Sequence, residues 1–323
     1  MEIISDLHLH SKYSRAVSQS MTLPIMTQFA RQKGLNLLTT GDWTHPLWMR
    51  EIKSNLEEVN DGIYGLKIND KRLKINENDP KFILSVEISS IYSQGGKARR
   101  IHCLLFAPSI EVAEKMNAEL IKRGCNLSSD GRPIVGLTPQ NILEILMGID
   151  QRCFLIPCHV WTPWFSLYGS MSGFDSIEEC FGDYSKYIYG IETGLSSDPS
   201  MNWRIKELQS RSILSFSDSH SPMKMGREST VFTIQNSKGK SQKLNSKLKI
   251  TYDDIRLAIM RDPKAKLKIG YTIEFYPEEG KYHYTGHRNC KVVYSPEDTK
   301  KKGKICPVCG RGLTVGVMER VED

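Results

Sequence analysis

The residues best suited to chemistry in this chain begin near its amino terminus, where Asp6, His8 and His10 follow a short apolar run. Side chains at positions i and i+2 point to one face of a strand, so both imidazoles would emerge together. Neutral imidazole nitrogens are common metal ligands. The motif therefore indicates either a metal site at the end of the first strand or two unrelated histidines in it.

Further histidines and carboxylates stand in or just beyond other strand-like runs. They are Asp42, His45, Glu87, His102, His159, Asp218 and His220. Together with His8 and His10, this set contains six of the eight histidines of the chain. Six buried imidazoles would need separate partners or would titrate near neutral pH, whereas metal coordination satisfies them together. We therefore predict that these residues converge on one divalent-metal centre.

Seven strand-like runs are expected to position these residues. The runs lie at 3–4, 35–40, 82–86, 101–106, 153–157, 189–191 and 213–217. Amphipathic helices are predicted at 22–33 and 110–123, each followed by glycine, and Pro139 and Pro199 mark two further helix starts. Alternating strands and helices indicate an α/β fold with a mostly parallel sheet or barrel, whose functional residues gather at the carboxyl ends of the strands. His102 lies early in its run, so that strand is expected to run antiparallel or to have another boundary.

Length and composition fit a globular protein with one large domain and a small appendage, because 39% of the 323 residues are hydrophobic and 25% are charged. No apolar run approaches the roughly 18 residues needed to cross a bilayer, and the start has no basic signal-like region. We expect a cytoplasmic protein with no membrane association. The net charge of +7 is compatible with a polyanionic partner, although the lysine clusters at 238–249 and 300–304 could each be solvated loops.

A second group of ligand-type residues lies near the carboxyl terminus. Its members are His287, Cys290, Cys306 and Cys309. The His-x2-Cys and Cys-x2-Cys spacings supply four nitrogen and sulfur ligands for a closed, tetrahedral structural zinc. A segment of roughly 40 residues has too little core to fold unaided, so the zinc would stabilise it.

The motifs, in their order along the chain, resemble the PHP (polymerase and histidinol phosphatase) superfamily of metal-dependent phosphoesterases. The resemblance spans roughly residues 1–235 and implies a distorted (β/α)7 barrel with a two- or three-metal site. The implied ligands are His8, His10, Glu87 and Asp218 for one ion, Glu87, His102 and His159 for a second, and His45 and His220 for a third. Asp42 is a further ligand or a partner of one. The chain departs from the family pattern where Trp43 and Thr44 separate Asp42 from His45.

Within that superfamily the chain resembles the archaeal and bacterial endonuclease Q family, through residues 40–46, 159–169 and 190–199 and the zinc motif. The resemblance implies a DNA repair endonuclease that nicks the backbone 5′ to a deaminated base (hypoxanthine, uracil or xanthine) or an abasic site. Two alternatives stay open. A PHP phosphatase for a small phosphate monoester would not need the zinc motif, and a non-catalytic DNA-binding remnant would usually have lost ligands.

Phosphodiester hydrolysis needs a nucleophile, neutralised phosphoryl charge and a stabilised leaving alkoxide, which metal ions about 3.5 to 4 Å apart can provide. We expect Asp218, Glu87 and His159 to carry catalysis, with Glu87 bridging two ions and Asp218 orienting the nucleophile. Two or three ions of zinc, manganese or magnesium would suit these ligands, beside the one structural zinc.

Recognition of an altered base in a duplex requires that the nucleotide be extruded from the stack. Four aromatic residues crowd the segment after His159. They are Trp161, Trp164, Phe165 and Tyr168. They are expected to stack on the flipped base or wedge the gap, or else to pack in the core. Lys300, Lys301 and Lys302 lie between the zinc ligand pairs and are predicted to contact DNA phosphates.

Three regions are expected along the chain. The barrel would occupy residues 1–235, a basic linker and helix 236–270, and the zinc-binding module 271–323. Residues 49–81, which are rich in lysine, glutamate and asparagine, would form an insertion within the barrel.

Overall fold

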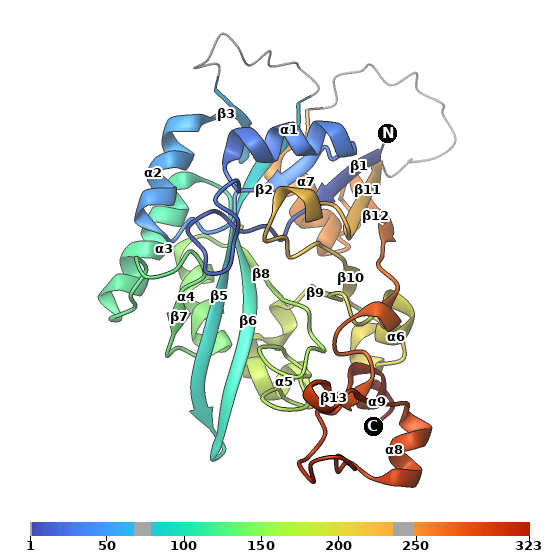
Figure 1. The fold of residues 1–323 in the computed structure, drawn as a ribbon. Coiled ribbons are helices and arrows are strands. Elements are labelled where there is room, and N and C mark those ends of the chain that lie inside the picture. The colour runs from blue at the N-terminus through green and yellow to red at the C-terminus, as the bar shows by residue number, and fades with distance from the viewer. Residues whose placement is uncertain (1, 68–78, 235–248) are drawn as a thin grey trace.

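Seven strands form a distorted barrel, and each overlaps one of the seven predicted runs (Figure 1). They are β1 (Glu2–Asp6), β2 (Leu37–Thr39), β5 (Lys81–Gln94), β6 (Lys97–Ala107), β8 (Phe154–Pro157), β9 (Gly190–Glu192) and β10 (Ser212–Leu214). The computed structural model describes residues 2–67, 79–234 and 249–323. The expected α/β barrel is confirmed.

Strand pairing explains where the predicted site residues lie. β1 pairs in parallel with β2, and β2 with β5, whereas β6 runs antiparallel to both β5 and β8. The early position of His102 therefore reflects an antiparallel strand. β9 and β10 form a separate parallel pair. The ring closes at one rim, where Val160 N–H donates to Glu192 O (3.0 Å) and Leu9 forms a parallel bridge with Ser219.

The remaining strands extend the sheet at its edges. They are β3 (Leu56–Asn60), β4 (Ile63–Leu66), β7 (Ile134–Val135), β11 (Ser229–Ile234) and β12 (Leu267–Ile273). β12 pairs with β11, which pairs with β1, so the expected boundary at residue 271 is wrong and β12 belongs to the barrel sheet. The expected insertion contains β3, β4 and the end of α2. Residues 68–78, and 235–248 with most of the first lysine cluster, lie outside the described residues.

The helices are α1 (Leu23–Lys33), α2 (Pro46–Asn55), α3 (Ile110–Lys122), α4 (Pro139–Ile149), α5 (Ile177–Phe181), α6 (Pro199–Trp203), α7 (Tyr252–Ile259), α8 (Pro296–Lys302) and α9 (Val317–Glu322). Four of them, α1, α3, α4 and α6, begin or end near the predicted signals, and α7 lies in the region expected to hold a helix. The Thr138 side chain caps α4 by accepting the Asn141 N–H, and the Asp198 side chain caps α6 by accepting the Met201 N–H. Gly34 ends α1 in the left-handed conformation. No helix in the described ranges has the length and apolarity to cross a membrane.

Apolar side chains fill the floor of the barrel and leave the opposite rim polar. Along β5, Ile83 joins the interior apolar cluster, and alternation places Glu87 on the same face four residues later. Phe106 and Phe154 stack in this cluster with ring centroids 4.5 Å apart, and Tyr252 of α7 packs beneath them. The floor excludes water from one side of Glu87, so water reaches the carboxylate only from the rim.

The zinc-binding module follows β12 and packs against the barrel at the lower right of Figure 1. Its hairpin consists of β13 (Thr285–His287) and β14 (Val292–Tyr294), and α8 and α9 complete it. Arg320 of α9 donates to the backbone oxygens of Tyr168 (3.1 Å) and Phe174 (3.3 Å). The module is thereby fixed to the barrel segment that follows His159.

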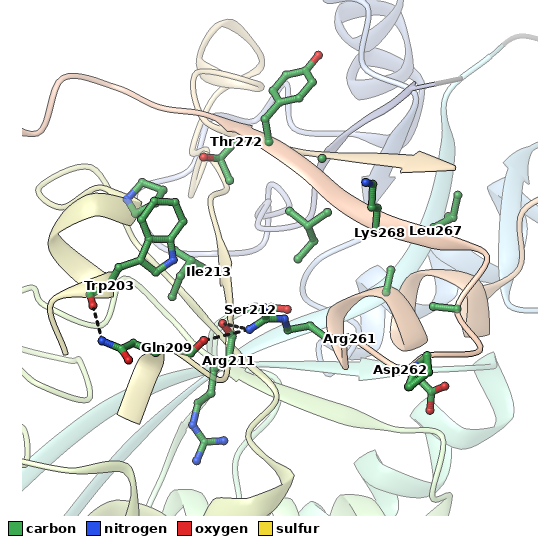
Figure 2. Close-up of a pocket in the computed structure, with 17 residues that line it drawn as sticks. Trp203, Gln209, Arg211, Ser212, Ile213, Arg261, Asp262, Leu267, Lys268 and Thr272 are labelled. Carbon is green, nitrogen blue, oxygen red and sulfur yellow. Dashed lines mark hydrogen bonds between the residues drawn. The ribbon is translucent and has the colours of Figure 1, made fainter. Parts of the chain in front are cut away.

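A groove of about 640 Å³ lies between α6 and β12 (Figure 2). Trp203, Lys268 and Arg261 line it, and the Arg261 guanidinium donates to the backbone oxygen of Gln209 at 3.1 Å. None of its lining residues belongs to the predicted site.

The close approach of two chain segments at the rim gives a first prediction. Gly41 has φ of 61°, and a Cβ there would overlap the carbonyl oxygen of Leu9. We expect Gly41→Ala to lower the free energy of unfolding by about 3 kcal/mol, from backbone strain and overlap together. Denaturant titration measures this. Gly34→Ala is the control, because Gly34 has φ of 73° but open space, and it should lose only about 1 kcal/mol. Equal losses would contradict the predicted overlap.

Candidate metal centre

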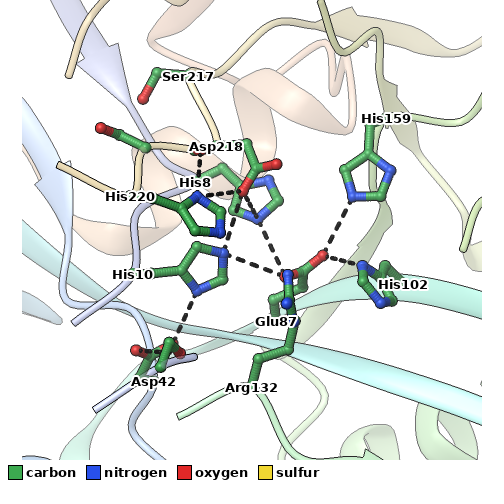
Figure 3. Close-up of polar contacts among 12 residues, drawn as sticks. His8, His10, Asp42, Glu87, His102, Arg132, His159, Ser217, Asp218 and His220 are labelled. Atoms are coloured by element: carbon green, nitrogen blue, oxygen red, sulfur yellow. Dashed lines mark hydrogen bonds and ion pairs between the residues drawn. The ribbon is translucent and has the colours of Figure 1, made fainter. Parts of the chain in front are cut away.

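Glu87 lies at the centre of the polar rim, and its two carboxylate oxygens face different groups of histidines (Figure 3). Oε1 lies 2.6 Å from His102 Nδ1 and 3.3 Å from His159 Nε2. Oε2 lies 3.3 Å from His10 Nε2 and 3.6 Å from His8 Nε2. The buried carboxylate can therefore bridge two metal ions, one on each side.

The first group combines two imidazoles with two carboxylates. His8, His10, Glu87 and Asp218 each offer a ligand atom, and these atoms lie within 4.8 Å of one another. Asp218 follows β10, and its Oδ1 lies 3.2 Å from His10 Nε2. His8 Nε2 is buried, with no hydrogen-bond partner in the described part of the chain. A cation among these atoms would satisfy that nitrogen, so the group fits a divalent metal.

The second group places His102 and His159 beside Glu87. Ser89 Oγ lies 3.1 Å from His102 Nε2, and Thr162 Oγ1 lies 3.2 Å from His159 Nδ1. These hydroxyls hold the far side of each ring and point the opposite nitrogen at the carboxylate. Burial lowers the pKa of His102 to about 4, so its ring is neutral at pH 7, the form that binds metal.

Glu192 orients the histidines of both groups. Its two carboxylate oxygens lie 2.9 and 3.0 Å from His8 Nδ1, and one of them accepts the backbone N–H of His159 at 2.9 Å. The side chain is buried at the end of β9. Glu192 therefore fixes which nitrogen of His8 faces the metal position.

Asp42 holds His10 in the same way, and the expectation that it ligates metal is not supported. Its Oδ1 lies 3.1 Å from His10 Nδ1. Its Oδ2 accepts hydrogen bonds from the Ser11 N–H (2.6 Å), the Ser11 hydroxyl (2.7 Å) and the Ser14 hydroxyl (2.9 Å). Both oxygens are engaged by the protein, so Asp42 positions an imidazole.

The two histidines predicted to hold a third ion make other contacts in the described part of the chain. His45 stacks on Tyr13, with ring centroids 4.5 Å apart, while the His220 ring lies 4.9 Å from that of His10. Across the described ranges, neither His45 nor His220 belongs to a group of three ligand atoms within 4.8 Å of one another. His220 therefore lies beside His10, and His45 lies beside Tyr13.

Two residues of the centre were missed in the sequence. Arg132, from the loop before β7, places its guanidinium 3.1 Å from Glu87 Oε2 and is partly exposed. Burial alone would raise the pKa of Glu87, but Arg132 and the surrounding histidines hold it well below its usual range. Cys158 lies within 4.8 Å of ligand atoms of both Glu87 and His159. Arg132 stands in a loop with no periodic pattern, so spacing gave no signal for it.

The C-terminal ligand residues come together as predicted. The ligand atoms of His287, Cys290, Cys306 and Cys309 lie within 4.8 Å of one another. Burial opposes ionisation of Cys306, but hydrogen bonds from the backbone N–H groups of Cys309 and Val308 lower its pKa to about 6. This favours the thiolate, which is the form that binds zinc.

The four predicted base-contacting aromatics divide into two pairs. Trp161 and Tyr168 are buried and stacked on each other at 4.6 Å, and Trp161 donates to Asn202, which favours the alternative that these two pack in the core. Trp164 and Phe165 are half-buried at the surface. The Phe165 ring lies 4.8 Å from the ring of His102.

The predicted phosphate-contacting lysines lie at the end of α8, and two of the three are paired. Lys302 Nζ lies 2.6 Å from Asp298, and Lys300 Nζ lies 3.6 Å from Glu322. Lys301 is exposed. Carboxylates thus lie beside two of the three lysines, and these pairs compete with contacts to DNA phosphates.

The shared carboxylate gives a second prediction. In Glu87→Gln the neutral amide binds cations weakly, so the barrel should lose its metal while the C-terminal zinc remains. Elemental analysis of the purified protein measures the metal per chain. Glu228→Gln is the matched control, because burial and the nearby Glu274 raise the pKa of Glu228 to about 9 and it is already uncharged at pH 7. Unchanged metal content in Glu87→Gln would refute the bridging position.

The C-terminal cluster gives a third prediction. Cys309→Ser should release one zinc per chain and expose the module to proteolysis, because its small core has few apolar residues, among them Val292 and Leu313. Zinc release and limited trypsin digestion measure both effects. Cys125→Ser, which changes a free thiol outside the cluster, should change neither. Retained zinc in Cys309→Ser would contradict the assignment.

Comparison with known proteins places the chain in a family. No protein-family model matches it. The uncharacterized protein MJ0043 of Methanocaldococcus jannaschii is 36% identical over 178 residues, which are 54% of this chain and 19% of that protein. The chain thus matches only about a fifth of the length of that relative.

Two solved structures cover the whole chain. The lesion-specific endonuclease PfuEndoQ from Pyrococcus furiosus superposes with a TM-score of 0.80 and 32% identity, over 100% of this chain and 71% of that one. An endonuclease Q in complex with a 27-mer duplex, which has an abasic lesion at the active site, gives a TM-score of 0.81 and 33% identity, over 100% and 72%. By this identity across more than two thirds of both structures, the chain belongs to the endonuclease Q family.

Proposed function

We propose that this chain is a metal-dependent DNA endonuclease that nicks the phosphodiester backbone 5′ to a deaminated base or an abasic site. The observation that carries the proposal is the division of the Glu87 oxygens between two groups of imidazoles at the rim of the barrel. Such a pair of adjacent sites suits phosphodiester hydrolysis. Similarity to the endonuclease Q that holds an abasic duplex at its active site supports DNA as the substrate.

Two ions would be held by the two groups described above. When bound, they would supply Lewis acidity that activates a water molecule and neutralises charge on the phosphoryl group. The mixture of imidazole and carboxylate ligands favours zinc or manganese over magnesium at both positions, and the sulfur-rich C-terminal cluster favours zinc.

Asp218 is the carboxylate of the centre that substrate and water can reach. Its side chain is 32% exposed, whereas those of Glu87, His8 and His10 are fully buried. His10 Nε2 lies 3.2 Å from Asp218 Oδ1, and Oδ2, which has no hydrogen bond among the described residues, would accept a proton from an attacking water. Asp218 would therefore both bind a metal ion and orient the attacking water.

Arg132 supplies a fixed positive charge beside the same carboxylates. Its side chain is 24% exposed, and one nitrogen bonds Glu87. A guanidinium has five donors, so the remaining ones can contact a non-bridging phosphoryl oxygen. This contact would hold the scissile phosphate over the centre and offset the charge that develops there.

A gel assay of labelled duplexes tests the function. Duplexes with inosine, uracil, an abasic site or no lesion should be cut only at the lesion, and a chelator should stop cutting until manganese is added. Asp218→Asn should lower the rate about 10²-fold or more while leaving the Kd for lesion DNA within about twofold.

Two outcomes would count against this function. Equal cutting of undamaged and damaged duplexes would show that the chain does not recognise lesions. Faster turnover of p-nitrophenyl phosphate than of any duplex would favour a monoester phosphatase.

A further inference from the structure

A second groove, of about 590 Å³, lies between the zinc-binding module and the loop that carries Trp164. We call it the module groove. The side chains that matter here are Trp164, Lys281, Tyr282, Tyr284, Arg288 and Lys291. Its volume falls within the range of about 300 to 1,000 Å³ that is usual for ligand-sized sites.

Three cations of the module groove have no carboxylate partner. Lys281, Arg288 and Lys291 are exposed, and within the described ranges none of their charged nitrogens forms an ion pair. One acidic residue, Glu278, lines the groove. This contrasts with Lys300 and Lys302 on α8, which are paired. Unpaired cations around a concave surface attract a polyanion.

Aromatic rings lie among these cations. Trp164 and Tyr282 meet edge to face, with centroids 6.1 Å apart, and Lys281 Nζ lies 4.8 Å from the Tyr282 ring centroid. Tyr284 is 36% exposed at the same surface. Aromatic faces interleaved with cations suit nucleic acid, since bases stack on the rings while phosphates contact the charges.

The module groove is joined directly to the metal centre. Phe165 lies against His102 of the second ligand group, and its neighbour Trp164 lines the groove. On the other side, His283 Nδ1 lies 3.0 Å from the backbone oxygen of Ser196 in the loop after β9. The groove is therefore held against the barrel loops that follow His159 and Glu192.

We propose that the module groove binds one unstacked nucleotide of the DNA strand that flanks the lesion. Its base stacks on Trp164, Tyr282 or Tyr284, and Lys281, Arg288 and Lys291 contact the adjoining phosphates. This proposal rests on the proposed function and assigns part of its substrate to a surface away from the metal ligands.

The charge of the groove is tested with the double variant Lys281→Ala/Lys291→Ala of the full chain. Loss of two phosphate contacts should weaken binding to an abasic duplex about tenfold or more at low salt and lower the slope of log K against log salt by about 2. Fluorescence anisotropy measures both.

Lys300→Ala/Lys302→Ala is the matched control, because it removes the same charge from the same module at paired positions. It should keep the wild-type slope. Equal effects of the two double variants would overturn the proposal, as would a wild-type slope in Lys281→Ala/Lys291→Ala.

Stacking is tested by photo-cross-linking duplexes that carry 5-iododeoxycytidine at successive positions beside the lesion. The base should cross-link to Trp164, Tyr282 or Tyr284 from one or two adjacent positions only, as located by mass spectrometry. Trp203 in the groove of Figure 2 is the internal control, since it is 57% exposed but lines a different groove. Cross-links to Trp203 alone would overturn the proposal.

Failure of the proposed function is distinguishable from failure of this proposal. If the wild-type chain binds duplexes through Lys281 and Lys291 but cuts none, the groove stands and the endonuclease function fails. If it cuts lesion DNA and both double variants bind like wild type, the function stands and the groove proposal is wrong.

Discussion

The structure depends on one buried carboxylate, Glu87, which faces imidazoles on two sides. Removing a carboxylate from water costs free energy unless cations or donors surround it. Four imidazole nitrogens and the Arg132 guanidinium lie within 3.6 Å of its oxygens. They come from β6 and from segments that follow β1 and β8 or precede β7. These groups meet Glu87 only in the closed barrel, so formation of the site and closure of the fold are one event.

The surrounding hydrogen bonds prepare the imidazoles before any ion arrives. Glu192 and Asp42 accept from the Nδ1 atoms of His8 and His10, so each ring is held with Nδ1 toward its carboxylate and Nε2 toward the centre, where a metal ion would replace the Nε2 proton. Beneath them the apolar floor keeps water away, so the electrostatic interactions of the rim are weakly screened. A centre that is already oriented loses little free energy to rearrangement when metal and substrate bind.

Much of this arrangement could be predicted from the sequence, because its signals are local. Apolar runs with ligand-type residues at their ends predicted the seven strands and one metal centre, the family resemblance implied how its ligands divide, and the Cys and His spacings predicted the zinc cluster. Other roles depend on contacts between distant segments. Asp42 became a partner of His10 because Ser11 and Ser14 occupy its other oxygen. Trp161 and Tyr168 are buried and stack on each other. Their spacing in the sequence does not predict this contact. Lys300 forms an ion pair with Glu322 of α9, and Arg132 forms an ion pair with Glu87 from a loop.

The zinc-binding module is held against the barrel by hydrogen bonds, and this attachment has a consequence for the proposed function. Extruding a nucleotide from a duplex costs a few kcal/mol, and this cost must be offset by contacts made only when the strand is distorted. Binding free energy gained on one part of an enzyme assists the reaction at another only when the two parts hold a fixed geometry. Here Arg320 ties α9 to the segment after His159, and His283 ties the module to the loop after Glu192. The second attachment ends four residues from Glu192, which orients His8, so under the proposed function contacts of DNA with the module would help to fix the position of the scissile phosphate.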